Sequence, residues 1–576
     1  MKYLVEIAIG PVQEFIASAR KLRDLWFGST LLSELSKCVA KSLHDQKCAL
    51  IFPAPKNDAD LEFGSSLVVA NKILAEYEGD DPRVVVTIAK ENWRKKLKDI
   101  SEETLEYVET SSFYKKMRVK TDLFRKQIED FGEFFAAWVP LREDYGKSRH
   151  EVEKLLAGRK NLREFSAPNW DGYGIPKSSL DGLRESVICD DKFCIPGLLK
   201  RNEKLDAVGL VKRFWPLLDK KNIKKFEDLA AISSVSWFNK IENDTQATHL
   251  HRQFELLFKK RENYPVEAIY EESKKAATWE EYDCVDSRKA CSILRDINKI
   301  VGAPQKYSCV LLGDGDNMGA AIDQIKSKDG FQKFTQDLSQ FADKVKNIVD
   351  KNGGCLIYAG GDDVMAFAPM ETALNCANEL RKAFAETMAP ICIQQGISKN
   401  PTLSIGMAIV HHSEPLSNAL DYARGAEKMA KNVDGKNALA VSQNKRSGAP
   451  LVVSGKWEPE GVLLGLFERL QNMIFLYKSE GEVAKLPSRL GYQLRESSIA
   501  AGDSLKFEKN GEKLVPMNAQ SALVLRIFSQ KQNAETQEQT ISDKLTAKLL
   551  LGQTSIRNLS DELVIARQFA GADNEG

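Results

Sequence analysis

The sequence predicts an α+β fold class, and its clearest part is a ferredoxin-like core between residues 301 and 445. Two observations support this prediction. Short apolar runs typical of strands alternate with long amphipathic segments typical of helices, and two of the runs flank a Gly-Gly-Asp-Asp string with the turn chemistry of a hairpin. The resulting order, β-α-β-β-α-β-α, is that of a ferredoxin-like sheet followed by one more helix.

Each element of this core has its own signal. Residues 307–312 form an apolar run that predicts a buried strand. A helix follows, because apolar residues recur three and four positions apart from Phe331 to Ile348, until Gly353 and Gly354 stop the pattern. The remaining elements are expected as strands at 356–359, 364–367 and 401–410, and as helices at about 374–384 and 416–431.

The rest of the chain is harder to interpret. Residues 2–9 predict a strand, Gly10-Pro11 opens a helix, a second helix follows Gly28, and 49–52 form a short strand. Residues 100–160 have mostly helical periodicity. Residues 166–300 are irregular and are interpreted as a separate, loop-rich domain. The tail from about 446 is expected to be helical, with a polar, glutamine-rich loop at 530–540.

Composition limits the classes of protein that this chain can belong to. Its 576 residues exceed what one hydrophobic core supports, so several domains are expected. Lys and Arg number 82 and Asp and Glu 81, a balance that argues against a free-standing protein that wraps nucleic acid. The ten cysteines are scattered and indicate reduced thiols. Since no apolar run reaches about 18 residues, we expect no membrane span and a cytoplasmic location.

Two acidic clusters carry the predicted chemistry. Gly313-Asp314-Gly315-Asp316-Asn317 directly follows the first strand of the core, and Gly360-Gly361-Asp362-Asp363 forms the hairpin. The first strand of a ferredoxin-like sheet lies beside this hairpin, so the carboxylates should converge and repel one another. Mg²⁺ or Mn²⁺, with its preference for oxygen ligands, would relieve the repulsion, and two such ions could activate a hydroxyl and stabilise a leaving pyrophosphate.

These motifs resemble the palm domain of GGDEF-type nucleotide cyclases. Within that group, GGDD favours the large signature subunit of type III CRISPR effector complexes. Further segments resemble the type III-B (Cmr) version of that subunit, and they occur in order along most of the chain. They are GPVQEFIASARKLRDLWFGSTLLSELS at 10–36, RKNLREF at 159–165, PKSSLDGLRESV at 176–187 and LDAVGLVKR at 205–213.

The resemblance implies four domains: a non-catalytic palm-like domain at 1–165, a middle domain at 166–300, a catalytic palm at 301–445 and a helical domain at 446–576. It also assigns roles to residues of this chain. The catalytic residues would be Asp314, Asp362 and Asp363, and these three with Asp316 would bind metal. The residues that contact the nucleotide would be Gly315, Asn317, Gly360, Gly361, Lys431 and Lys436.

The implied reaction joins ATP molecules. The 3′-hydroxyl of one ATP attacks the α-phosphate of another, which releases pyrophosphate and leads to cyclic oligoadenylates for antiviral defence. In the family, pairing of guide RNA (crRNA) with target RNA inside the complex of Cmr subunits starts this activity. Two alternatives stay open: the palm attaches AMP to another small molecule such as S-adenosylmethionine, or the subunit is a catalytically silent scaffold.

Two departures from the family pattern limit what is carried over. Many relatives begin with an HD nuclease domain, whereas here the palm strand starts at Met1 and the single His44-Asp45 pair lies at the end of a helix, so we predict no HD-type DNase. Relatives often bind zinc through CxxC pairs. The cysteines that could replace them, Cys189 with Cys194 and Cys284 with Cys291, have the wrong spacing, and buried free thiols are the simpler interpretation.

Overall fold

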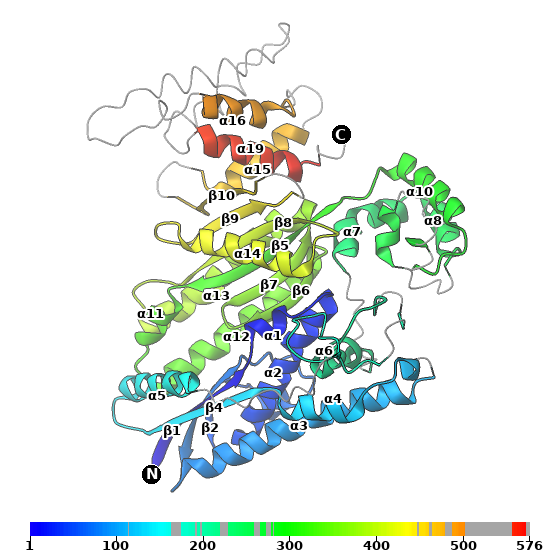
Figure 1. The fold of residues 1–576 in the computed structure, drawn as a ribbon. Helices are drawn as coiled ribbons and strands as arrows, with labels where there is room; N and C mark the ends of the chain where they lie inside the picture. The colour runs from blue at the N-terminus through cyan, green and yellow to red at the C-terminus, as the bar shows by residue number, and fades with distance from the viewer. Residues whose placement is uncertain are drawn as a thin grey trace, which may run out of the picture.

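The computed structural model describes residues 1–571 apart from 113, 163–173, 190–192, 196–197, 219–227, 259–264, 272–277, 280–281, 446–448, 460–463, 479–485 and 501–555. Figure 1 shows two β-sheets with their helices stacked along the molecule, a group of helices beyond the second sheet, and a further helical cluster at its side. The α+β fold class is confirmed. The expected loop at 530–540 and most of the tail lie outside the described residues.

The first sheet has four strands in the order β2-β3-β1-β4, all antiparallel to their neighbours. This is the strand order of a ferredoxin-like fold. The strands are β1 (Lys2–Gly10), β2 (Ala49–Phe52), β3 (Lys72–Glu78) and β4 (Glu133–Pro140). The helices are α1 (Gln13–Ala17), α2 (Leu22–Asp45), α3 (Pro82–Thr110), α4 (Thr121–Glu129) and α5 (Tyr145–Asn161), with short 3-10 turns η1 (Asp58–Leu61) and η2 (Tyr114–Met117).

Three details of this part differ from the sequence prediction. The first helix begins at Gln13 rather than at Pro11. The second begins at Leu22 and runs through Gly28, because the carboxylate of Asp24 accepts hydrogen bonds from the backbone amides of Arg20 and Lys21 and so stabilises an earlier start. The stretch 100–160 contains strand β4, whose continuous apolar run lacks the alternation by which a half-buried strand is recognised.

The second sheet confirms the predicted core. Its strands lie in the order β6-β7-β5-β8-β9-β10, and the first four repeat the pattern of the first sheet. Strand β9 is parallel to β8, and β10 is antiparallel to β9. The strands are β5 (Tyr307–Asp316), β6 (Cys355–Gly360), β7 (Asp363–Pro369), β8 (Thr402–His411), β9 (Ala438–Gln443) and β10 (Leu451–Lys456). The helices are α11 (Met318–Asp323), α12 (Lys328–Lys351), α13 (Met370–Gln395) and α14 (Leu416–Lys431).

The remaining elements correct two expectations. Within 166–300, the described residues are largely helical rather than loop-rich, and in the tail β10 interrupts a region predicted to be helical. The elements are α6 (Ala207–Phe214), η3 (Trp215–Leu217), α7 (Leu229–Glu242), α8 (Thr245–Glu255), η4 (Val266–Tyr270), α10 (Ser287–Val301), α15 (Leu466–Lys478), α16 (Leu490–Ala500) and α19 (Ile556–Phe569). Helix α6 packs into the core of the first sheet, whereas α8 and α10 share a separate apolar cluster with α7. The boundaries of the four domains stay predictions.

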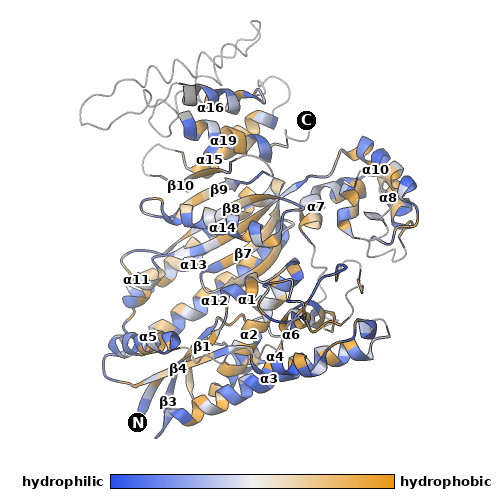
Figure 2. Ribbon diagram, in the orientation of Figure 1, coloured by the Kyte–Doolittle hydropathy of each residue, from blue (hydrophilic) through white to orange (hydrophobic). Residues whose placement is uncertain are grey.

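The two sheets share one hydrophobic core. Leu4 and Ala8 of β1 belong to the same buried cluster as Phe331 and Phe334 of α12. Figure 2 shows that the strands of the second sheet are mostly hydrophobic and that the outer faces of α3 and α5 are hydrophilic. Among the helices of the described ranges, none is both long and apolar enough to cross a membrane.

A buried charge cluster fixes α2 against α6. The guanidinium of Arg213 donates hydrogen bonds to both carboxylate oxygens of Asp24, at 2.5 and 2.7 Å, and to Glu203 at 3.0 Å. The side chains of Arg213 and Asp24 are fully buried. Beside them, the ammonium of Lys212 donates to the backbone oxygens of Phe15 and Ser18. These contacts hold the first turn of α2, which packs against the second sheet through Leu22 and Leu25.

We predict that Asp24→Asn lowers the free energy of unfolding by about 3 kcal/mol, because it leaves the buried Arg213 with one carboxylate partner instead of two. Urea unfolding followed by tryptophan fluorescence measures the change. The matched control is Glu102→Gln, which breaks the exposed Arg125–Glu102 pair and should change the free energy by less than about 1 kcal/mol. Equal effects of the two substitutions would contradict the prediction.

Candidate active site

The two acidic clusters meet at one end of the second sheet. Strand β5 carries Asp314 near its end, and it pairs with β7, which begins at Asp363. The turn between β6 and β7 consists of Gly361, with a φ of 65°, and Asp362. The predicted hairpin is therefore confirmed, and the sheet brings its carboxylates to the end of β5 as expected.

Glycines permit the close packing of this turn. A side chain at Gly360 would clash with the phenol of Tyr358, whose hydroxyl donates a hydrogen bond to the backbone oxygen of Gly360 at 3.4 Å. A Cβ atom at Gly315 would lie 2.6 Å from the side chain of Asp362. Any other residue at Gly315 would therefore push the hairpin away from β5, and the distance between the two acidic clusters depends on this glycine.

The two hairpin carboxylates, Asp362 and Asp363, have raised pKa values. Burial, together with repulsion from Asp314 and Asp316, raises the pKa of Asp362 to about 6. Asp363 reaches the surface, but partial desolvation and repulsion from Asp362, Asp314 and Glu427 raise its pKa to about 7. Burial and these two hairpin aspartates also raise the pKa of the Tyr358 phenol. A cation with oxygen affinity would relieve this repulsion.

Lys431 supplies one positive charge. Its ammonium lies 2.8 Å from the Oδ1 atom of Asp314 and 3.2 Å from that of Asp316, and it donates a hydrogen bond to the backbone oxygen of Gly315 at 2.9 Å. Burial alone would lower the pKa of Lys431, but its contacts with Asp314 and Asp316 raise it above the usual value. Helix α14 can approach β8 closely enough for this contact because residue 406 is a glycine. Any side chain at Gly406 would clash with the backbone of Glu427.

Asp316 has a different environment from the other three aspartates. It is fully buried, and its Oδ2 atom accepts hydrogen bonds from the hydroxyls of Thr402 and Ser404, at 2.8 and 2.7 Å, and from the amide of Asn437 at 3.0 Å. The turn that presents this amide contains Lys436, with a left-handed φ of 56°. Asp316 thus fixes the turn after α14, and Asn317, with a φ of 60°, begins α11.

The chemistry of this site fits a divalent cation, although its present geometry is not that of a coordination sphere. Asp314, Asp362 and Asp363 offer the carboxylate oxygens that Mg²⁺ and Mn²⁺ prefer. Burial and mutual repulsion raise the pKa values of Asp362 and Asp363, and a bound cation would oppose both effects. Within the described ranges, however, no three acidic, histidine or cysteine side chains converge closely enough to hold a metal ion. The side chains are instead arranged around Lys431.

Two residues of the site were missed in the sequence. Glu427 lies one helical turn before Lys431, and burial and the charge of Asp314 raise its pKa. The four-residue spacing from Lys431 places both residues on one face of α14 and could have indicated it. Tyr358 lies two residues before the glycine that its phenol contacts, and no motif in the sequence pointed to it.

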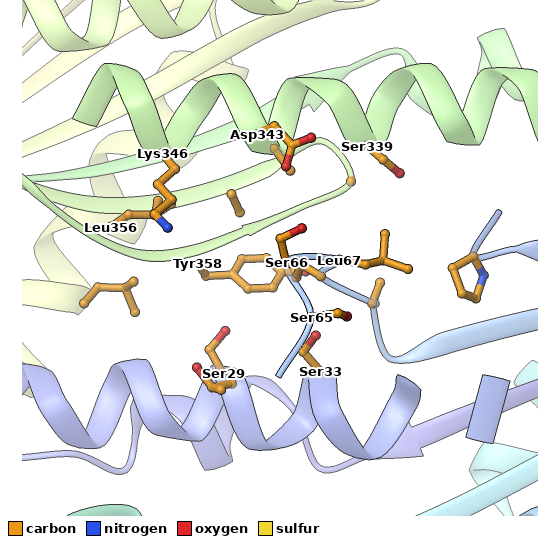
Figure 3. Close-up of a pocket in the computed structure, with 18 of the residues that line it drawn as sticks. Ser29, Ser33, Ser65, Ser66, Leu67, Ser339, Asp343, Lys346, Leu356 and Tyr358 are labelled. Atoms are coloured by element: carbon orange, nitrogen blue, oxygen red, sulfur yellow. The ribbon is translucent and has the colours of Figure 1, made fainter. Parts of the chain in front are cut away.

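A cavity of about 970 Å³ lies between α2 and α12 and reaches the hairpin at Gly361. Figure 3 shows Ser29 and Ser33 of α2 and Tyr358 of β6 around this cavity, with Asp343 and Lys346 on α12 at its other side. Its wall is completed by Ser65, Ser66 and Leu67, which belong to the connection between β2 and β3, and by Trp26 and Trp215. Both sheets thus contribute to one cavity whose walls are aromatic and hydroxyl-bearing.

The cysteines considered for zinc and the histidine considered for an HD site lie outside the acidic site. Cys291 is buried in the core of the helical cluster and Cys284 packs beside it, whereas Cys189 and Cys194 are exposed. None of the described cysteines belongs to a group of three metal-binding side chains, and the exposure of Cys189 and Cys194 differs from the buried thiols expected. The imidazole of His44 lies 3.6 Å from Asp58 on the exposed surface.

Comparisons with known proteins give a consistent result. Residues 307–440 match the family model of the Cas10/Cmr2 second palm domain, and residues 4–119 match the N-terminal model of the CRISPR-associated protein Cmr2. The CRISPR system Cmr subunit Cmr2 of Pyrococcus furiosus is 26% identical over 611 residues, which cover 88% of this chain and 68% of that protein. Cmr2 of Saccharolobus solfataricus is 31% identical over 83 residues, 12% of this chain and 8% of that protein.

Two solved structures of the type III-B Cmr-beta complex contain chains of the same fold. The apo complex matches with a TM-score of 0.65 at 14% identity over 99% of this chain and 82% of that one. The complex bound to cognate target RNA matches with a TM-score of 0.66 at 13% identity, over 99% of this chain and 83% of that one.

The paired ferredoxin-like sheets and the acidic hairpin define a palm-domain protein of the GGDD type. Residues 307–440 and 4–119 match the two Cas10/Cmr2 family models in their expected places. The chain's predicted resemblance to the signature subunit of type III-B effector complexes is confirmed.

We predict that Asp362→Asn raises the melting temperature of the metal-free protein at pH 8 more than at pH 5. The raised pKa means that the folded state binds this proton more tightly than the unfolded state, so stability is lost as the pH rises from about 4 to above 6. Differential scanning fluorimetry across this pH range tests the sign. A gain that is larger at pH 5 than at pH 8 would refute it.

Proposed function

We propose that this chain is the ATP-using nucleotidyltransferase of a type III-B Cmr complex and makes cyclic oligoadenylate messengers when target RNA binds. One observation carries the proposal. Asp314, Asp362 and Asp363 come from two separate segments, repel one another at the end of β5, and lie next to the cavity shared by both sheets. A purely structural role gives no reason to concentrate mutually repelling carboxylates there.

The chain's own residues would position the reactants and neutralise charge. Asp314, Asp362 and Asp363 would hold Mg²⁺ or Mn²⁺, with two ions expected. Such ions lower the pKa of a hydroxyl and stabilise a leaving pyrophosphate. The backbone at Gly361 has open space beside it for phosphate oxygens, whereas Gly360 and Gly315 are buried and would act by holding the hairpin close to β5. Asp316 would act indirectly, because its Oδ2 atom is already occupied by three donors.

The cavity offers room for nucleotides. Its volume of about 970 Å³ lies at the upper end of the range typical of small-molecule sites. Trp26, Trp215 and Tyr358 provide flat apolar surfaces for a base, and the hydroxyls of Ser29 and Ser33 provide donors and acceptors for a ribose or phosphate. Holding two nucleotides in fixed orientation is the main contribution that a protein makes to such a reaction. Lys431, Lys436 and Asn317 would contact phosphate groups at the far side of the hairpin.

The proposed partners follow from the family. These are the other Cmr subunits, guide RNA and target RNA. The related Cmr-beta structure bound to cognate target RNA supports this assignment. The nearly balanced charge of this chain, 82 basic against 81 acidic residues, fits a subunit that binds RNA together with its partners rather than through bulk electrostatics. We further propose a cytoplasmic location, no HD-type DNase activity in this chain, and no structural zinc.

The experiment assembles the complex with guide and target RNA, adds ATP with Mg²⁺ or Mn²⁺, and identifies the products by mass spectrometry. We expect cyclic oligoadenylates, and we expect the double change Asp362→Asn and Asp363→Asn to reduce their rate of formation at least about 100-fold. The control is Asp421→Asn on α14, an exposed aspartate paired with Arg424, which should leave the rate unchanged.

The other outcomes separate the alternatives. AMP conjugates that form only when S-adenosylmethionine is supplied would replace oligoadenylate synthesis by conjugation. Absence of any product, in a complex that still binds target RNA, would identify the subunit as a scaffold. DNA cleavage that persists in the hairpin variant would contradict the proposed lack of DNase activity.

A further inference from the structure

Lys431 lies where a cation is needed most. Its ammonium contacts Asp314 at 2.8 Å, Asp316 at 3.2 Å and the backbone oxygen of Gly315 at 2.9 Å, so it bridges three acceptors on the end of one strand. Only 17% of its side chain is exposed. One of these acceptors, Asp314, is also a proposed metal ligand, and the same oxygen cannot serve both cations at full strength.

The geometry makes the two cations competitors. A Mg²⁺ or Mn²⁺ ion lies about 2.1 Å from a ligand oxygen, so an ion on the Oδ1 atom of Asp314 would lie within about 5 Å of the ammonium. Two positive charges at that separation repel, and in a partly buried site the repulsion is weakly screened. The present arrangement agrees with this competition, since in the described part of the chain the carboxylates do not converge as a coordination sphere.

We propose that Lys431 is a resident cation that holds Asp314 until a metal-bound triphosphate arrives, and then moves from the carboxylates to the phosphate. The inference rests on the proposed function in one respect, namely that a divalent cation and a triphosphate are the ligands of this site. It makes Lys431 a positioning residue that opposes metal binding without nucleotide and supports it once nucleotide is bound.

The surroundings allow this exchange. Lys431 is the last residue of α14, so its side chain can turn without disturbing the helix. The helix itself is fixed by its close contact with β8 at Gly406. Asp316 keeps the three hydrogen-bond donors on its Oδ2 atom after the lysine leaves, so it stays in place, and only its Oδ1 atom loses a partner. Asp314 has no such support and is 40% exposed, so it is the group that becomes available.

The test measures Mn²⁺ binding to the full chain without nucleotide, from the electron paramagnetic resonance signal of free Mn²⁺. We expect Lys431→Gln to bind Mn²⁺ about tenfold more tightly than the unchanged protein, because one competing charge is gone. Lys431→Arg keeps the positive charge, so its binding of Mn²⁺ should stay as weak as that of the unchanged protein. Lys428→Gln removes an exposed lysine of the same helix turn and should change nothing.

A double variant tests whether the gain in Mn²⁺ affinity depends on Asp314. The gain in Lys431→Gln should disappear when Asp314→Asn is added, because the released oxygen is then absent. Unchanged or weaker Mn²⁺ binding in Lys431→Gln, with a normal melting temperature, would overturn the inference, and so would a gain that survives Asp314→Asn. None of these measurements needs turnover. A complex that makes no oligoadenylate would therefore refute the proposed function and leave this result standing.

Discussion

Repulsion among the carboxylates at the end of β5 is the constraint on which the rest of the site depends. Asp314 stands at a strand end and Asp362 and Asp363 at a hairpin, and burial together with the charge of Asp314 raises the pKa values of the two hairpin carboxylates. Such an arrangement is unfavourable unless cations join it. The fold therefore has to hold these groups together against their charge, and it does so through backbone pairing and glycine positions rather than through the carboxylates themselves.

The shared core explains why two similar sheets are needed. Helix α12 packs against β2 of the first sheet as well as against its own sheet, so the cavity between α2 and α12 is bounded by elements that share one core. The buried Arg213 cluster adds to this by fixing the start of α2, whose next turns carry Ser29 and Ser33. A residue far from the acidic hairpin thus determines the shape of the opposite cavity wall.

The sequence predicted what depends on local pattern. The order of elements in the second sheet, the hairpin and the position of Asp314 all follow from periodicity and turn chemistry. The start of α2 was missed although part of its signal is local, since Asp24 accepts hydrogen bonds from the amides of Arg20 and Lys21. Its second contact, with the distant Arg213, could not be predicted. The role of Asp316 was also beyond local pattern. Its neighbours Thr402, Ser404 and Asn437 reach it only through the pairing of β5 with β8 and the turn before β9.

The contrast between Asp314 and Asp316 shows how two neighbouring aspartates acquire different uses. Successive side chains along a strand alternate in direction, so residues two apart share a face, and both carboxylates meet Lys431. Only Asp316 is also buried under β8 and the turn at 435–437, where fixed donors neutralise it. Asp314 has Lys431 as its charged partner and solvent on its other side. When the ammonium leaves, the exposed Asp314 becomes available to another cation, whereas Asp316 stays in place through the three donors on its Oδ2 atom. This asymmetry is what makes an exchange of cations at Asp314 physically possible.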